Sequence, residues 1–79
     1  MKARIIVTLK TGVLDPQGKA IEAALKSLGI EGVDGVRQGK VFDIVVSAAD
    51  AGAAETTLRT ACEKLLANTV VENYAIEIL

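Results

Sequence analysis

The sequence predicts an α+β domain of the ferredoxin-like type, a four-stranded antiparallel sheet with two helices on one face. Two segments have the apolar spacing of amphipathic helices, and the remaining segments alternate between apolar and polar residues as strands do. Their order along the chain is β-α-β-β-α-β, in which right-handed crossovers place both helices on the same face. With 79 residues the chain has room for a single domain, residues 1–79.

Residues 3–9 alternate and predict the first strand. Asp15 and Pro16 predict the start of the first helix, because Asp15 can cap its free N–H groups and proline at the first helical position loses no hydrogen bond. Gly29 is typical of a residue that ends a helix. The apolar stripe between these signals consists of Ala20, Ile21, Ala24, Leu25 and Leu28, with Glu22 and Lys26 expected to pair on the wet side.

Residues 33–48 predict a hairpin, with a short strand over 33–37, a turn at Gln38-Gly39 and a longer strand over 40–48. Because Arg4 and Asp43 fall on the same sheet face, we expect a cross-strand ion pair of Asp43 with Arg4 or another basic residue rather than a catalytic role for Asp43.

A second helix is expected to open at residues 50–52 and to end at Asn68 in the left-handed conformation, followed by a last strand over 70–79. On its outer side, Glu55, Arg59 and Glu63 are i,i+4 neighbours. Its buried stripe is Ala51, Ala54, Leu58, Ala61, Cys62 and Leu65.

The second face of the predicted sheet mixes apolar and charged residues and is too apolar to be fully wet. Covering this face with a second copy would stabilise so thin a domain, so we expect a homodimer or tetramer. The alternative is a normal scatter of surface apolar residues. The residues of this face are Arg4, Ile6, Val41, Asp43, Val45, Asn73, Ala75 and Glu77.

Composition excludes several classes of function. The net charge is −1 without a basic run, and Phe42 and Tyr74 are the only aromatic residues, which argues against a nucleic-acid surface. No apolar run is long enough for a membrane span or a signal peptide. A single cysteine and no histidine exclude an intrachain disulfide and disfavour a zinc site, and we expect a reducing cytoplasm.

No residue has the setting of a catalytic group. Cys62 lies on a buried stripe without a cationic neighbour, so we expect core packing rather than reactivity. The helix start at residues 15–19 could bind phosphate with the help of Lys10 and Lys19, but the segment lacks P-loop spacing and Asp15 would cap the same donors, which is the interpretation we favour. Bottom-up, the chain is a non-catalytic module that works through its surfaces.

Val13 and Leu14 are apolar residues in a loop. They could form a docking knob for a partner protein, or a hydrophobic staple that packs against the first helix turn. The sequence leaves both alternatives open.

Three stretches carry a resemblance to a known family: VTLKTGVLDPQG over residues 7–18, VRQGK over 36–40 and CEKLLANTVVENY over 62–74. In this order and spacing the chain resembles the PurS family, the small subunits of bacterial phosphoribosylformylglycinamidine (FGAM) synthase, from residue 2 to the end. Thr69 departs from the family pattern, because many relatives have a proline there.

The resemblance implies a subunit of an ATP-dependent ligase that converts formylglycinamide ribonucleotide (FGAR) and glutamine to FGAM in purine biosynthesis. The complex would use ATP and Mg²⁺, with no cofactor, metal or catalytic residue on this chain. The chain would bridge the synthetase and glutaminase subunits and assist ammonia transfer. Excluding water from that route would keep ammonia unprotonated and nucleophilic.

The residues that match the family motifs are expected to form partner or oligomer contacts. Two other hypotheses are a ligand-sensing module that binds a metabolite at a dimer interface and an RNA-binding sheet, the latter disfavoured by the missing aromatics. The expected contact residues are Lys10, Gly12, Val13, Leu14, Asp15, Pro16, Gln17, Gly18, Arg37, Gly39, Lys40, Asn68, Val70 and Tyr74.

Overall fold

Three strands and two helices make up the fold, together with one short π-helical turn. The structure is a computed structural model that describes the whole chain, residues 1–79. In chain order the elements are β1 (Lys2–Leu9), α1 (Pro16–Ser27), β2 (Gly39–Val45), α2 (Ala51–Ala61), the π-helical turn η1 (Cys62–Leu66) and β3 (Glu72–Ile78). Small α+β architecture is therefore confirmed.

The sheet is antiparallel and has the strand order β2-β1-β3, with β1 in the centre. The predicted fourth strand over 33–37 and the predicted hairpin over 33–48 are wrong, because β2 pairs with β1 and residues 33–37 form no strand. Gly35 lies in the middle of residues 33–37, with Gly32 before them and Gly39 after them, and a strand gains little from residues without side chains to pack.

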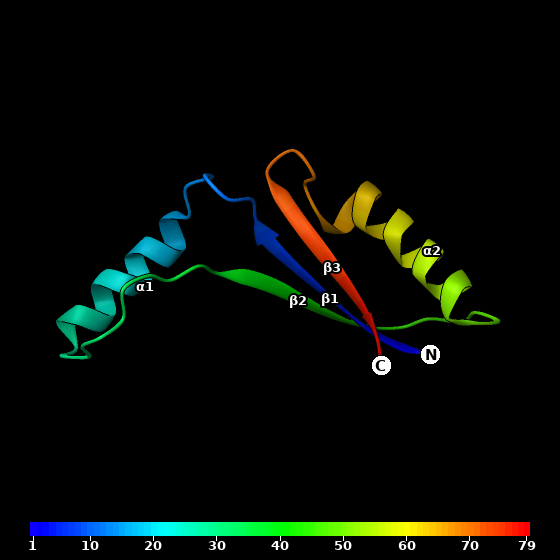
Figure 1. Cartoon of the computed structure of the whole chain (residues 1–79), viewed down its shortest axis with the longest axis horizontal. Coiled ribbons are helices and arrows are strands. Elements are labelled where there is room, and N and C mark those ends of the chain that lie inside the picture. The colour runs from blue at the N-terminus through cyan, green and yellow to red at the C-terminus, as the bar shows by residue number, and fades with distance from the viewer.

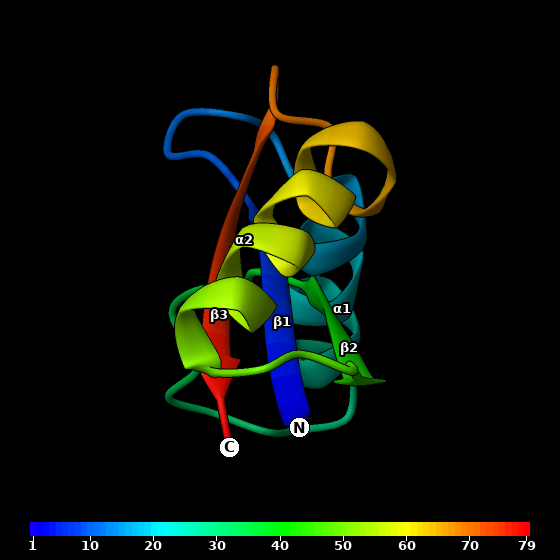
Figure 2. The same ribbon diagram turned by 90° about the vertical axis from the view of Figure 1, so that its right-hand side faces the viewer.

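Helix α2 covers one face of the sheet (Figure 2). Asp50 caps it, since its carboxylate accepts from the Ala53 N–H at 2.8 Å. The core that α2 makes with β1 comprises Ala3, Ile5, Val7, Val46, Ala54, Leu58, Cys62 and Ala67. The expected buried stripe is thus confirmed at Ala54, Leu58 and Cys62. It is wrong at Ala51 and at Leu65 of η1, which are exposed, and Ala61 is half-buried.

The helical segment ends at Leu66, and no residue other than glycine has a positive φ, so the expected left-handed Asn68 is wrong. Asn68 instead accepts the Val70 N–H through its side chain at 3.3 Å and shapes the turn into β3.

Helix α1 lies apart from the sheet, as an arm at the opposite end of the molecule from α2 (Figure 1). The expected cap at Asp15 is confirmed, and Gly29 has a φ of +79° just beyond the helix, as expected. The expectation of two helices on one sheet face is wrong. Gly18 is the only buried residue of α1.

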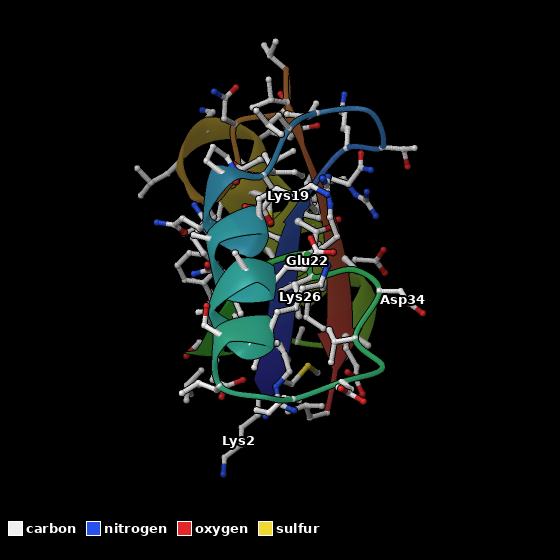
Figure 3. All side chains as sticks on the ribbon, turned by 90° about the vertical axis from the view of Figure 1, so that its left-hand side faces the viewer. Lys2, Lys19, Glu22, Lys26 and Asp34 are labelled. Carbon is white, nitrogen blue, oxygen red and sulfur yellow. The ribbon has the colours of Figure 1, made fainter.

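The molecule is elongated as a result. Its principal extents are 50 × 25 × 15 Å and its radius of gyration is 15.9 Å, against about 12 Å for a compact domain of this length. Viewed along the long axis, α1 stands in front of the sheet and α2 behind it (Figure 3). We call α1 and the loop that follows it, residues 16–38, the arm.

Surface ion pairs follow the predicted pattern in two of three places. Arg4 binds Asp43 across β1 and β2 at 2.8 Å, and Arg59 binds Glu55 on α2 at 2.7 Å, as expected. Glu22 pairs with Lys19 at 3.4 Å rather than with Lys26 (Figure 3). None of the helices is long and apolar enough to span a membrane.

Candidate functional site

One end of the sheet collects the three sequence stretches on which the family resemblance rests. Because β1 is antiparallel to both neighbours, its last residues lie beside the first residues of β2 and β3: Thr8 is opposite Gly39, and Leu9 is opposite Glu72. Beyond the strands, the Lys10 N–H donates to the Val71 carbonyl at 2.9 Å. We call this the motif end of the sheet; it lies at the upper side of Figure 1.

A hollow of about 300 Å³ lies at the motif end, with walls from all three stretches. On one wall Lys40 faces Glu72 at 3.7 Å, and Glu72 also accepts the Asn68 N–H at 2.7 Å. No buried side-chain nitrogen or oxygen in the protein lacks a hydrogen-bond partner. Most of the lining is polar: Val7, Leu9, Asp15, Gln17, Gln38, Gly39, Lys40 and Glu72.

Asp15 is 5% exposed and joins two parts of the chain. Its carboxylate accepts the Gly18 N–H at 2.9 Å, which caps α1, and the Gln38 N–H at 2.7 Å, which holds the segment leading into β2. These backbone donors, the Gln38 N–H most of all, lower the pKa of Asp15 below its usual value of 3.8, with a smaller contribution from the nearby Arg37 charge. The Gly18 N–H at the helix start is therefore already bound by the chain's own carboxylate, whose negative charge also disfavours the phosphate-site alternative.

Arg37 completes this junction from the opposite direction. Its guanidinium donates to the Val13 carbonyl at 2.8 Å and to the Lys10 carbonyl at 3.1 Å. The loop after β1 is thus tied to the segment before β2 across the root of the arm. We call Asp15, Gly18, Arg37 and Gln38, with the carbonyls of Lys10 and Val13, the arm clasp.

Exposed apolar side chains stand on the loops around the motif end. Leu14 is 69% exposed and Val70 is 80% exposed. A hydrophobic staple would bury Leu14 against the first turn of α1. Its exposure rules out that alternative for Leu14 and leaves a side chain available to a partner.

Two further apolar surfaces are exposed, one on the arm and one on the sheet face turned away from α2. Leu28 of the α1 stripe is 75% exposed, and Val45 of that sheet face is 80% exposed. Neither surface is covered within the chain, since α1 does not pack on the sheet. Further exposed apolar residues in these two regions are Ile6, Ile21, Ile30 and Val41.

The structure brings together nearly all the residues expected to form contacts. Those in the ranges 10–18, 37–40 and 68–70 lie at the motif end or on the loops beside it. Tyr74 does not: it pairs opposite Val7 within β3 and packs half-buried against the core.

Two residues of the site, Gln38 and Glu72, lie inside the family stretches but were not among the individual contact residues named from the sequence. Gln38 acts through its backbone N–H, which gives no side-chain signal. Glu72 lies four residues after Asn68, and an acidic residue at the start of a strand beside the basic motif stretch was the available signal.

The one cysteine of the chain is held in the core. Cys62 is fully buried under α2, and burial raises the pKa of its thiol, with Glu63 adding to the effect. No group of three or more His, Cys, Asp or Glu side chains is placed to hold a metal ion. What the motif end offers is shaped surface: a polar hollow, a rigid clasp and exposed apolar loops.

Comparison with known proteins gives a consistent result over the whole chain. The family model described as "PurS: Phosphoribosylformylglycinamidine (FGAM) synthase" matches residues 2–79. The chain is 49% identical over 75 residues to the subunit PurS of Synechocystis, covering 95% of this chain and 75% of that protein. It is 42% identical over 77 residues to the Bacillus subtilis subunit PurS, covering 98% and 90%.

Solved structures agree. The crystal structure of Methanocaldococcus jannaschii PurS matches with a TM-score of 0.89 and 38% identity, covering 96% of this chain and 92% of that one. A chain of the PurLQS structure from Thermotoga maritima matches with a TM-score of 0.91 and 36% identity, covering 99% and 95%.

Proposed function

The chain belongs to the PurS family of FGAM synthase subunits, and from this premise we propose how its surfaces serve the complex. It is a subunit of the ATP-dependent ligase that makes FGAM from FGAR and glutamine, and it associates with the synthetase and glutaminase subunits. We propose that it is non-catalytic, that it bridges those two subunits in the cytoplasm, and that ATP and Mg²⁺ bind to the partners.

One observation carries the bridging proposal: the three family stretches, which are far apart in the sequence, converge at the motif end. Their polar groups are already paired within the chain, through Asp15, Arg37 and the Lys40–Glu72 pair. A prearranged surface of this kind suits protein docking, because little ordering has to occur on binding. Ammonia released by one partner would then pass to the other along a route from which this subunit helps to exclude water.

We further propose that the chain self-associates through the arm. The face of the sheet under α2 retains half-exposed Phe42 and Ile44 on β2, since α2 packs toward β3. The arm of a second copy carries the matching apolar stripe, with Ile21 and Leu28 exposed. A two-helix, ferredoxin-like layer would thus be completed between chains, which supports a homodimer as the basic unit and permits a tetramer of such dimers.

Reconstitution tests the bridging proposal. The isolated chain is expected to be inactive, and mixing it with the synthetase and glutaminase subunits is expected to restore FGAM formation from glutamine. With ammonium chloride in place of glutamine, the synthetase subunit is expected to work without this chain, because the bridge matters only when ammonia must be transferred. Full glutamine-dependent activity in the absence of this chain would contradict the proposal.

A matched pair of variants locates the docking surface. Val70→Asp places a charge on the motif end and is expected to lower glutamine-dependent activity by about tenfold or more, because burying an unpaired charge in an interface costs at least that much affinity. Thr56→Asp places the same charge on α2 opposite its buried residues Ala54 and Leu58 and serves as the control. Equal activity of the two variants would exclude Val70 from the docking surface.

A further inference from the structure

The arm is held where its two connecting loops meet the sheet. Helix α1 buries no side chain against the sheet and makes no extensive contact with it. Two loops connect α1 to the sheet, one over residues 10–15 after β1 and one over residues 28–38 before β2. A helix held only by two glycine-containing loops would sample many directions unless the loops were fixed to each other.

The arm clasp joins these loops to each other with three hydrogen bonds and caps α1 with a fourth. Arg37 donates twice to the first loop, at 2.8 and 3.1 Å, and Asp15 accepts one N–H from the helix and one from the second loop, at 2.9 and 2.7 Å. Each side of the junction thus holds the other through a charged group, and such bonds are stronger than neutral ones.

Gly18 lets the second loop approach the helix. A Cβ atom at this position would overlap the Val36 carbonyl oxygen and lie 2.6 Å from Asp15 Oδ2. The close approach of backbone to backbone is therefore possible only without a side chain. Glycine here is unfavourable for the helix itself, which indicates that the approach matters more than helix propensity.

We propose that Arg37 and Asp15 are positioning residues that lock the arm at the angle at which a second copy receives it. This rests on the self-association proposed above, and it assigns these motif residues a role inside the protomer rather than in contact with a partner. A locked arm presents its apolar stripe in one orientation, so the second copy binds without first ordering the arm.

A distance measurement tests the lock directly. Spin labels are placed at Ser27→Cys on α1 and Thr57→Cys on α2, both exposed, while the buried Cys62 stays unlabelled. Dilution with unlabelled chain isolates the distance within one protomer. The wild-type background is expected to give a narrow distribution, and Arg37→Ala a broad one. Arg59→Ala is the matched control, because it removes a guanidinium from the similarly exposed Glu55 pair on α2.

Sedimentation of the same variants measures the consequence. Arg37→Ala is expected to weaken self-association by about tenfold or more, and Arg59→Ala to change it by no more than about twofold, as is usual for a surface substitution. Arg37→Lys is expected to rescue only in part, because a lysine cannot bond both carbonyls in one plane.

Gly18→Ala separates positioning from helix stability and also serves if Arg37→Ala fails to fold. A purely structural role in α1 predicts a more stable helix and unchanged association, since alanine is the better helix former. The clasp predicts a broadened label distance and weaker association, because the Cβ pushes the second loop away.

Two results bear on different parts of the account. Distances that stay narrow in both Arg37→Ala and Gly18→Ala overturn the clasp, even if the protein is a dimer. A wild-type chain that sediments as a monomer overturns the proposed self-association, and the label distances in that monomer still decide whether the clasp locks the arm.

Discussion

The two helices of this protein are similar in sequence, but only one of them packs against the sheet. Both are capped by an aspartate, both carry one apolar stripe, and they have 12 and 11 residues. Helix α2 buries Ala54 and Leu58 against the sheet, whereas α1 buries nothing but a glycine. The stripe of a helix therefore shows that a face has to be covered, and it does not show which chain covers it.

Each half stands for one source of stability. The half with β1 and α2 forms a small core of its own, and the apolar face of the arm is left uncovered within the chain. A chain of this size with a core of only eight buried hydrophobic residues is marginal alone, and the proposed association with a second copy would supply the missing burial. The experiments below separate these two contributions, beginning with the largest expected effect.

The Leu58→Ala variant tests the half of the molecule that has its own core. Leu58 lies on the buried side of α2 and is 2% exposed. Truncating a fully buried leucine costs about 2–5 kcal/mol of unfolding free energy. Urea denaturation followed by circular dichroism is expected to show that loss. A change below about 1 kcal/mol would mean that α2 does not hold the core in solution.

The Ile21→Asp variant tests whether the arm takes part in self-association. The substitution puts a charge into the exposed stripe of α1 and is expected to weaken self-association by about tenfold or more, because burying an isoleucine side chain contributes about 1.5–3 kcal/mol. Sedimentation equilibrium measures the effect.

The control is Ala23→Asp, on the other side of the same helix and also exposed in the protomer. It adds the same charge to the same helix and is expected to leave association nearly unchanged. If both variants associated as the wild type does, the α1 stripe would not be an interface.

Acidification tests the junction between the two halves. The pKa of Asp15 is lowered by the Gln38 and Gly18 N–H groups, so its contribution to stability is present above about pH 3.8 and is lost as the pH falls through the lower folded-state pKa. Asp15→Asn is expected to lower the melting temperature by about 4 °C or more at pH 7.

The difference in melting temperature between wild type and Asp15→Asn is then expected to shrink as the pH is lowered below 3.8, where the wild-type carboxylate becomes protonated. Thermal melts of both proteins between pH 3 and pH 7 measure it. A difference that stayed constant with pH would show that the charge of Asp15 is not what holds Gly18 and Gln38.

The smallest effect is expected from Arg4→Ala. Its partner Asp43 lies 2.8 Å away, and the pair raises the pKa of Arg4 and lowers that of Asp43, but both side chains are exposed. Solvent screens such pairs, so the melting temperature of the protomer is expected to change by about 2 °C or less. A larger fall that depends on protein concentration would place this sheet face in an interface.

The sequence predicts local structure well and relative placement poorly. The cap at Asp15, the stop at Gly29, the Arg4–Asp43 pair and the buried position of Cys62 all follow from short-range rules and are confirmed. The loop over 33–37 was wrongly predicted as a strand, because two valines at a spacing of three, between glycines, do not decide between a strand and a loop.

The candidate site shows the same division. The motif stretches identify most of its residues, and the antiparallel register places them together. The contacts that join the two loops could not be predicted, because the partners of Arg37 and the second partner of Asp15 are backbone groups that any residue carries: the carbonyls of Lys10 and Val13, and the Gln38 N–H. Nor could the position of the arm be read from its stripe.

The central claim is that another copy of this chain covers the apolar stripe of the arm. Sedimentation equilibrium of the purified protein over a range of micromolar concentrations tests it most directly. The account predicts a mass of at least twice the 8.2 kDa of the protomer. A single species of protomer mass, with the arm still helical, would contradict it.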